Sequence, residues 1–108
     1  MSGGGAVSGP GAFVQIFEFN TDRIAEYDGI QDRFAETIGT ARTTRWSILA
    51  ADRDRPGRYL AVVEFPGYPE AMANSGHRAT ATFLAELRAI CDGEPEFRNL
   101  DVRQSRPY

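Results

Sequence analysis

The residue best suited to acid–base chemistry is His77, the only histidine in the 108 residues. It lies two positions after Ser75, in the stretch NSGHRATATF that begins at Asn74. Serine is typical of the residue that begins a helix, because its hydroxyl accepts a hydrogen bond from a free backbone N–H. We therefore expect His77 in the first helical turn, where the helix dipole keeps its imidazole neutral. A neutral imidazole at a pocket edge can take a proton from an acidic phenol or enol, or bind a ligand; otherwise His77 is a boundary residue.

Gln15 and Trp46 are the next candidates. Gln15 is the lone polar residue among Phe13, Phe17 and Phe19 on one face of a predicted strand. A buried amide needs a partner, so this pattern indicates either a ligand contact or an internal hydrogen bond. Trp46 lies within another predicted strand, where it either packs in the core or stacks on a flat aromatic substrate.

Other kinds of chemistry have no support in the sequence. There is no phosphate-binding glycine loop, no dinucleotide fingerprint and no metal-ligand spacing around the single histidine. All 12 basic residues are arginine, which excludes Schiff-base chemistry on lysine. We expect no cofactor and no metal site.

Composition indicates one ordinary globular domain with a thin core, which dimerisation would enlarge. The chain is 42% hydrophobic and 25% charged, with a net charge of −3, so nucleic acid is a poor candidate partner. The single cysteine excludes an internal disulfide and favours a cytoplasmic protein. No apolar run approaches the ~20 residues of a membrane span. We expect a flexible tail over 1–11, one domain over 12–104 and a short tail over 105–108.

Local patterns predict four strands and two helices. The strands are expected at 12–20, 40–52, 58–65 and 96–103, with helices between the first and second and between the third and fourth. Thr21 is the expected cap of the first helix, and the second is expected to break at 75–76, with Ser75 capping its second segment. The order β-α-β-β-α-β predicts an α+β, ferredoxin-like fold with a four-stranded antiparallel sheet.

Both faces of the first strand are largely apolar, so we expect both to be covered. Glu18 and Glu64 point to the face opposite Gln15. We interpret these two carboxylates as structural, with Arg45 or Arg98 as their partners.

The stretch YLAVVEFPGYPEAMANSGHRATATFLAEL, together with DGEPEFRNLDV near the end of the chain, resembles the antibiotic-biosynthesis-monooxygenase-like group of dimeric α/β-barrel proteins. The resemblance runs from Phe13 to Val102. It implies a homodimer in which two sheets form a barrel, with a hydrophobic small-molecule substrate between sheet and helices. It also implies cofactor-independent oxygenation of an aromatic or polyketide-like compound, although isomerase or cyclase activity fits the same residues.

The residues that would perform this role fall into two sets. His77, Gln15 and Asn74 are the predicted catalytic residues, with His77 as base and the two amides orienting the substrate or stabilising its oxyanion. The predicted pocket walls are Trp46, Phe17, Phe65, Tyr27 and Tyr68. Two alternatives stay open: a non-catalytic ligand-binding or stress-related dimer, and a haem-binding or haem-degrading protein that uses His77.

Overall fold

The computed structural model describes residues 11–108 as a four-stranded sheet with three α-helices. In chain order the elements are β1 (Phe13–Asn20), the 3-10 turn η2 (Ile24–Glu26), α1 (Tyr27–Ile38), the 3-10 turn η3 (Gly39–Ala41), β2 (Trp46–Ala51), β3 (Arg58–Phe65), α2 (Tyr68–Ser75), α3 (Arg78–Ile90) and β4 (Glu96–Asp101). The sheet order is β2-β3-β1-β4 and every pairing is antiparallel. The predicted α+β, ferredoxin-like fold is confirmed.

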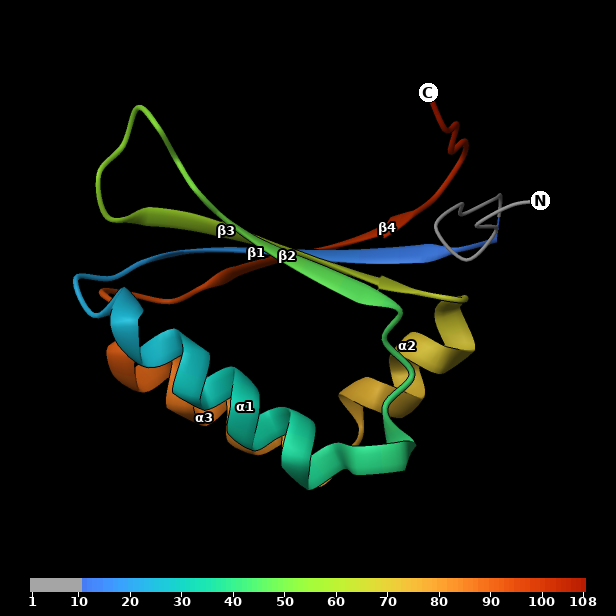
Figure 1. The fold of residues 1–108 in the computed structure, drawn as a ribbon, viewed down its shortest axis with the longest axis horizontal. Helices are drawn as coiled ribbons and strands as arrows, with labels where there is room; N and C mark the ends of the chain where they lie inside the picture. The colour runs from blue at the N-terminus through green and yellow to red at the C-terminus, as the bar shows by residue number, and fades with distance from the viewer. Residues whose placement is uncertain (1–10) are drawn as a thin grey trace.

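All three α-helices lie on one side of the sheet (Figure 1). The phenylalanines of β1 point toward them, because residues 13, 17 and 19 are buried while the alternate positions are only partly covered. The main core joins β1 and β3 to α1 and α3 through Phe17, Phe19, Tyr27, Ile30, Ala61, Phe83, Leu87 and Ile90. These eight side chains hold the two long helices against the sheet.

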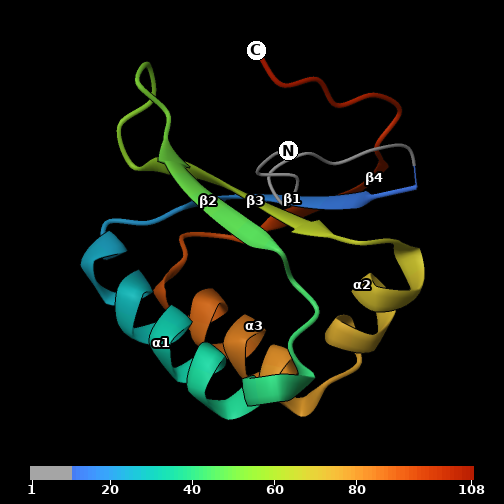
Figure 2. The ribbon, with the colours of Figure 1, turned by 45° about the vertical axis from the view of Figure 1, so that its right-hand side comes forward.

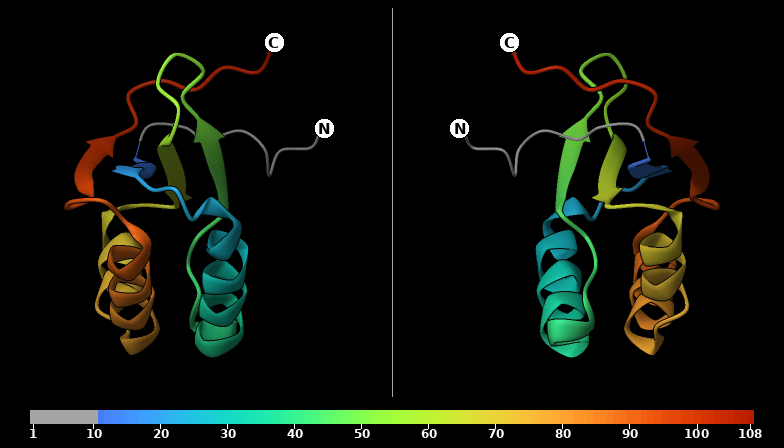
Figure 3. Two further views of the ribbon diagram at one scale, coloured as in Figure 1. Left: turned by 90° about the vertical axis from the view of Figure 1, so that its left-hand side faces the viewer. Right: turned by 90° about the vertical axis from the view of Figure 1, so that its right-hand side faces the viewer.

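The other side of the sheet has no helix over it within residues 11–108 (Figures 2 and 3). The strand register places eight apolar side chains on this side: Val14, Ile16, Trp46, Ile48, Ala50, Leu60, Val62 and Leu100. We call these residues the open face. Ile48 is 54% exposed and Leu100 is 43% exposed, which is unusual for large aliphatic side chains grouped together.

Charged pairs flank the open face at both ends. Glu18 binds Arg58 and Arg98, and these hydrogen bonds hold the pKa of the Glu18 carboxyl below its usual range, with Arg58 the larger cause. At the other end, Arg45 lies 3.7 Å from the buried carboxylate of Glu64. The predicted pairing of Glu18 and Glu64 with Arg98 and Arg45 is confirmed.

Three predicted boundaries are wrong. Thr21 does not cap α1; its hydroxyl donates to the Ile90 carbonyl and accepts from the Arg23 N–H, so it ties the β1–α1 connection to the end of α3. The second strand begins at Trp46 rather than residue 40, because 39–41 form a 3-10 turn. Strand β4 ends at Asp101, two residues before the predicted end. The predicted tail over 1–11 lies outside the described residues except for Gly11.

Candidate functional site

A cavity of about 480 Å³ lies between the sheet and the helices. This volume is within the range of small-molecule sites in proteins. Its lining consists of Gln15, Phe17, Tyr27, Gln31, Phe34, Ala35, Arg42, Thr44, Arg45, Trp46, Ser47, Val63, Phe65, Asn74, Ser75, Thr80, Phe83, Leu84, Arg88 and Phe97. These residues come from all four strands, all three α-helices and the linker before β2.

The aromatic walls of the cavity hold one another in place. Phe83 contacts three rings, with centroid distances of 6.1 Å to Phe17, 6.2 Å to Tyr27 and 5.5 Å to Phe34. Phe97 lies 5.5 Å from Phe17. Edge-to-face and tilted contacts of this kind favour a fixed arrangement of rings. A flat aromatic ligand would therefore meet walls that are already formed.

Gln15 enters this aromatic surface with a fixed orientation. Its Nε2 donates to Oδ1 of Asn99 on β4, at 3.1 Å, across the β1–β4 pair. Within residues 11–108, no hydrogen bond is recorded to the Oε1 of Gln15. The Oε1 of Gln15 can therefore accept a hydrogen bond from a ligand hydroxyl. The hydrogen bond to Asn99 fixes the orientation of the Gln15 amide.

Asn74 supplies the second amide. The residue is only 5% exposed, at the end of α2, and its Oδ1 accepts from the Thr43 N–H at 3.5 Å. Its backbone carbonyl accepts from the Thr80 hydroxyl. No partner is recorded for its Nδ2 in the described part of the chain, so this group can donate to a ligand oxygen.

Tyr27 stays a neutral phenol at physiological pH. Burial, and to a smaller extent the charge of Asp28, raises the pKa of Tyr27 to about 12. The group can donate a hydrogen bond but cannot act as a base near neutrality.

The cavity brings together six of the eight residues predicted for the site. Gln15, Phe17, Tyr27, Trp46, Phe65 and Asn74 line it, whereas His77 and Tyr68 do not. Tyr68 opens α2, is 58% exposed and lies 5.6 Å from the Phe13 ring. Their assigned roles remain predictions.

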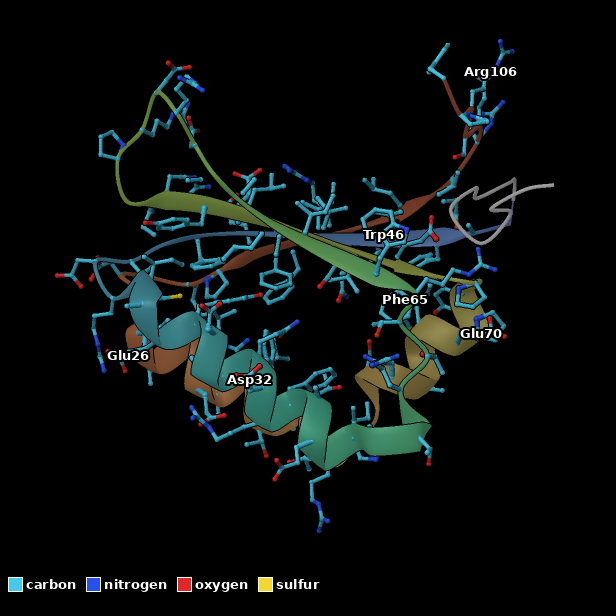
Figure 4. The ribbon with its side chains drawn as sticks, in the orientation of Figure 1. Glu26, Asp32, Trp46, Phe65, Glu70 and Arg106 are labelled. Atoms are coloured by element: carbon cyan, nitrogen blue, oxygen red, sulfur yellow. The ribbon has the colours of Figure 1, made fainter. Side chains whose placement is uncertain are left out.

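Trp46 and Phe65 lie near the same end of the sheet (Figure 4). Phe65 is buried, but Trp46 is opposite Glu64 in the register, on the side of the open face. Trp46 therefore borders the cavity from the sheet edge and extends toward the open face, which differs from a simple pocket wall.

His77 has a structural role that the sequence did not predict. It is itself the N-cap of α3, and its Nδ1 accepts from the Ala79 N–H at 2.9 Å. An accepting Nδ1 places the proton of a neutral ring on Nε2. The predicted cap, Ser75, is instead the last residue of α2. The prediction of Ser75 as cap is wrong because the break between the helices falls at 76–77.

Two substitutions at His77 separate capping from catalysis. We expect His77→Ala to lower the free energy of unfolding by about 1 kcal/mol, since the Ala79 N–H loses its acceptor. Asparagine caps helices well, so His77→Asn removes the imidazole and should change stability by only a few tenths of a kcal/mol. Urea unfolding at pH 7 measures both values. Substrate turnover by His77→Asn then tests the predicted base, because loss of activity in this folded variant would support a catalytic role for His77.

Several residues that line the cavity were not predicted from the sequence. Arg42, Arg45 and Arg88 come from the linker before β2 and from the last turns of α3. Gln31 and Phe34 come from one face of α1. The helical pattern marks an apolar stripe, but it does not indicate that a polar residue beside the stripe reaches a cavity.

Residues 11–108 contain neither a metal-binding cluster nor a membrane-spanning helix. No group of three or more His, Cys, Asp or Glu side chains in this range could hold a metal ion. No helix there has the length and apolar character needed to cross a membrane.

Comparison with solved structures identifies the fold. A variant of SnoaB, a cofactor-independent oxygenase from Streptomyces nogalater, matches with a TM-score of 0.75 and 17% identity over 91% of this chain and 99% of its own. A Caulobacter crescentus protein assigned by name to the antibiotic biosynthesis monooxygenases has a TM-score of 0.73 and 13% identity, with 88% and 92% covered. A conserved protein from Methanosarcina mazei has a TM-score of 0.70 and 10% identity, with 86% and 92% covered.

Sequence comparison adds no relative: no protein-family description and no curated protein matches the chain. The likeness therefore concerns the fold. The chain has the ferredoxin-like fold that its strand and helix patterns predict, and this is also the fold of the antibiotic-biosynthesis-monooxygenase-like proteins that it resembles.

Proposed function

We propose that this protein is a dimeric, cofactor-independent oxygenase of a flat, aromatic, polyketide-like small molecule. The observation that carries the proposal is the 480 Å³ cavity, in which fixed aromatic rings surround two amides with free hydrogen-bonding groups. The names of the similar structures, SnoaB in particular, support the same class of reaction.

The two amides would orient a substrate that enolises. The Oε1 of Gln15 would accept from a substrate hydroxyl, and Asn99 holds that amide in the required orientation. The Nδ2 of Asn74 would donate to the substrate oxygen that becomes negative when the enol loses its proton. A fixed donor aimed at a developing oxyanion contributes more in a cavity with apolar walls than in water.

An anthrone is the simplest substrate of this kind. Its activated CH₂ becomes C=O: one atom of O₂ enters the product, and the other leaves as water with both hydrogens. The four electrons that O₂ takes come from the substrate carbon, so the reaction needs no external reductant. The described lining contains no Asp, Glu, Lys or His. The enol proton would therefore go either to solvent or to His77, the predicted base outside this lining.

Dimerisation through the open face is the second part of the proposal. Eight apolar side chains lie there, and Ile48 is 54% and Leu100 43% exposed. Opposite charges flank them, with Glu18 and Glu96 beside Arg58 and Arg98. A surface with both signs of charge around an apolar centre can match a second copy of itself about a two-fold axis.

Oxygen uptake with anthrone tests the catalytic part. We expect saturable uptake above the spontaneous rate, with one O₂ consumed per anthraquinone formed. Gln15→Leu should lower kcat/KM about tenfold, which corresponds to one lost hydrogen bond of about 1.4 kcal/mol. Gln104→Leu, in the exposed C-terminal segment, is the control and should retain full activity.

Uptake equal to the protein-free rate would exclude anthrone oxygenation. Tight anaerobic binding of the same compound would then favour the non-catalytic, ligand-binding alternative. The haem alternative has less support, because His77 uses Nδ1 as a helix cap and does not line the cavity.

A further inference from the structure

The cavity has a charge opposite to that of the whole chain. Its lining contains three arginines, Arg42, Arg45 and Arg88, and no aspartate or glutamate, whereas the full sequence has a net charge of −3. Such a separation of charge gives the cavity a positive potential within an acidic protein. A ligand with a negative group would be attracted to it.

The neighbouring carboxylates offset this charge only in part. Arg45 lies 3.7 Å from the buried carboxylate of Glu64, which offsets the charge of this one arginine. Arg88 lies 3.3 Å from Glu94, but both side chains are about half exposed or more, and such surface pairs are weak. Arg42 has no recorded side-chain hydrogen bond or ion pair within residues 11–108, so its guanidinium is available.

The cavity is lined both by aromatic rings and by arginines, and this indicates a ligand with an apolar part and an anionic part. The rings of Phe17, Phe34 and Phe83 favour a flat, apolar body. A guanidinium binds a carboxylate through two parallel hydrogen bonds. Gln15 and Asn74 are neutral and cannot supply this selectivity.

We propose that the substrate is an aromatic acid whose carboxylate is bound by the arginines of the cavity, with Arg42 as the main contact. This inference rests on the proposed function, because it assumes an aromatic ligand in the same cavity. It adds that a neutral analogue of the same shape is a poor ligand.

A matched pair of anthraquinones tests the inference by isothermal titration calorimetry. Anthraquinone-2-carboxylic acid is ionised at pH 7, and anthraquinone-2-carboxamide is its neutral counterpart of similar shape. We expect the acid to bind at least about tenfold more tightly, a difference of about 1.4 kcal/mol. Raising the salt concentration should weaken binding of the acid and leave the amide nearly unchanged.

Arg42→Gln should remove most of the preference for the acid and leave the affinity for the amide unchanged. Arg55→Gln, in the exposed β2–β3 turn, removes the same charge outside the cavity and should retain the preference. Arg45→Gln and Arg88→Gln extend the series, and circular dichroism checks that each variant is folded.

The outcomes separate the two proposals. If neither compound binds, the aromatic site itself is wrong. If both bind equally well, the cavity accepts aromatic ligands but does not select an acid, and this inference is wrong. A preference for the acid that persists in all three cavity variants would also overturn it, since the arginines would not be its source.

Discussion

Ile48→Asp is expected to convert the protein from a dimer to a folded monomer. Ile48 is 54% exposed in the single chain, so an aspartate there costs the monomer little. In a dimer formed through the open face, the same carboxylate would be buried against apolar side chains without a cation. An uncompensated buried charge destabilises an interface by several kcal/mol, which is enough to separate the subunits at micromolar concentration.

Size-exclusion chromatography with light scattering measures the outcome. The wild-type mass is expected at twice the 11.9 kDa of the chain, and that of Ile48→Asp at 11.9 kDa. Met72→Asp is the matched control, because Met72 is also an exposed apolar residue but lies on α2, on the helical side of the sheet. A monomeric wild type would contradict the dimer, and a dimeric Ile48→Asp would move the interface to another surface.

Phe83→Ala is expected to lower the free energy of unfolding by about 3–5 kcal/mol. Phe83 is 8% exposed and connects β1, α1 and α3 through its contacts with Phe17, Tyr27 and Phe34. Its removal would open a void beside the existing cavity and remove one ring contact from each of Phe17, Tyr27 and Phe34. The loss is a large part of the about 5–15 kcal/mol that stabilises a domain of this size.

Phe97→Ala is the control for this substitution. Phe97 lines the same cavity and contacts Phe17, but it is 36% exposed on an edge strand. Its loss leaves a site open to solvent rather than a closed void, so we expect a cost below about 1.5 kcal/mol. Urea unfolding at one fixed protein concentration compares the two variants, since the proposed dimer would contribute to apparent stability. Equal costs would mean that Phe83 does not hold α1 and α3 together.

The strands were the most predictable part of the fold. The third strand, residues 58–65, has the predicted bounds, because a turn of proline and glycine precedes it and another follows it. The second strand begins six residues later than predicted. Its threonines at 43 and 44 favour extended backbone, but they precede Trp46, the first paired residue of β2. Only the sheet pairing decides where a strand starts.

The polar residue among the phenylalanines of β1 was the most useful signal for the site. Gln15 was predicted to have either a ligand or an internal partner, and it has the internal partner Asn99 and a free acceptor in the cavity. Asn99 lies 84 positions away in the sequence, so its contact with Gln15 follows from the β1–β4 pairing and from no local pattern.

The sequence by itself determined the order of strands and helices, the side of β1 that is rich in phenylalanine, and the break within the second helical region. These are local properties, since the alternation of strands, the spacing of helices and the turn residues act over a few positions. Tertiary structure decided which side chains meet. It placed Arg42 and Arg88 in one cavity from distant parts of the chain.

His77 illustrates the difference. The sequence predicted a break near this residue but placed the cap at Ser75, two positions before the observed cap. Each residue turns a helix by about 100°, so an error of two positions redirects a side chain by about 200°. The packing of α2 and α3 against the sheet decides where α3 begins. His77 is therefore the N-cap of α3 and does not line the cavity. The polar side chains that do line it include the amides of Gln15 and Asn74 and the three arginines.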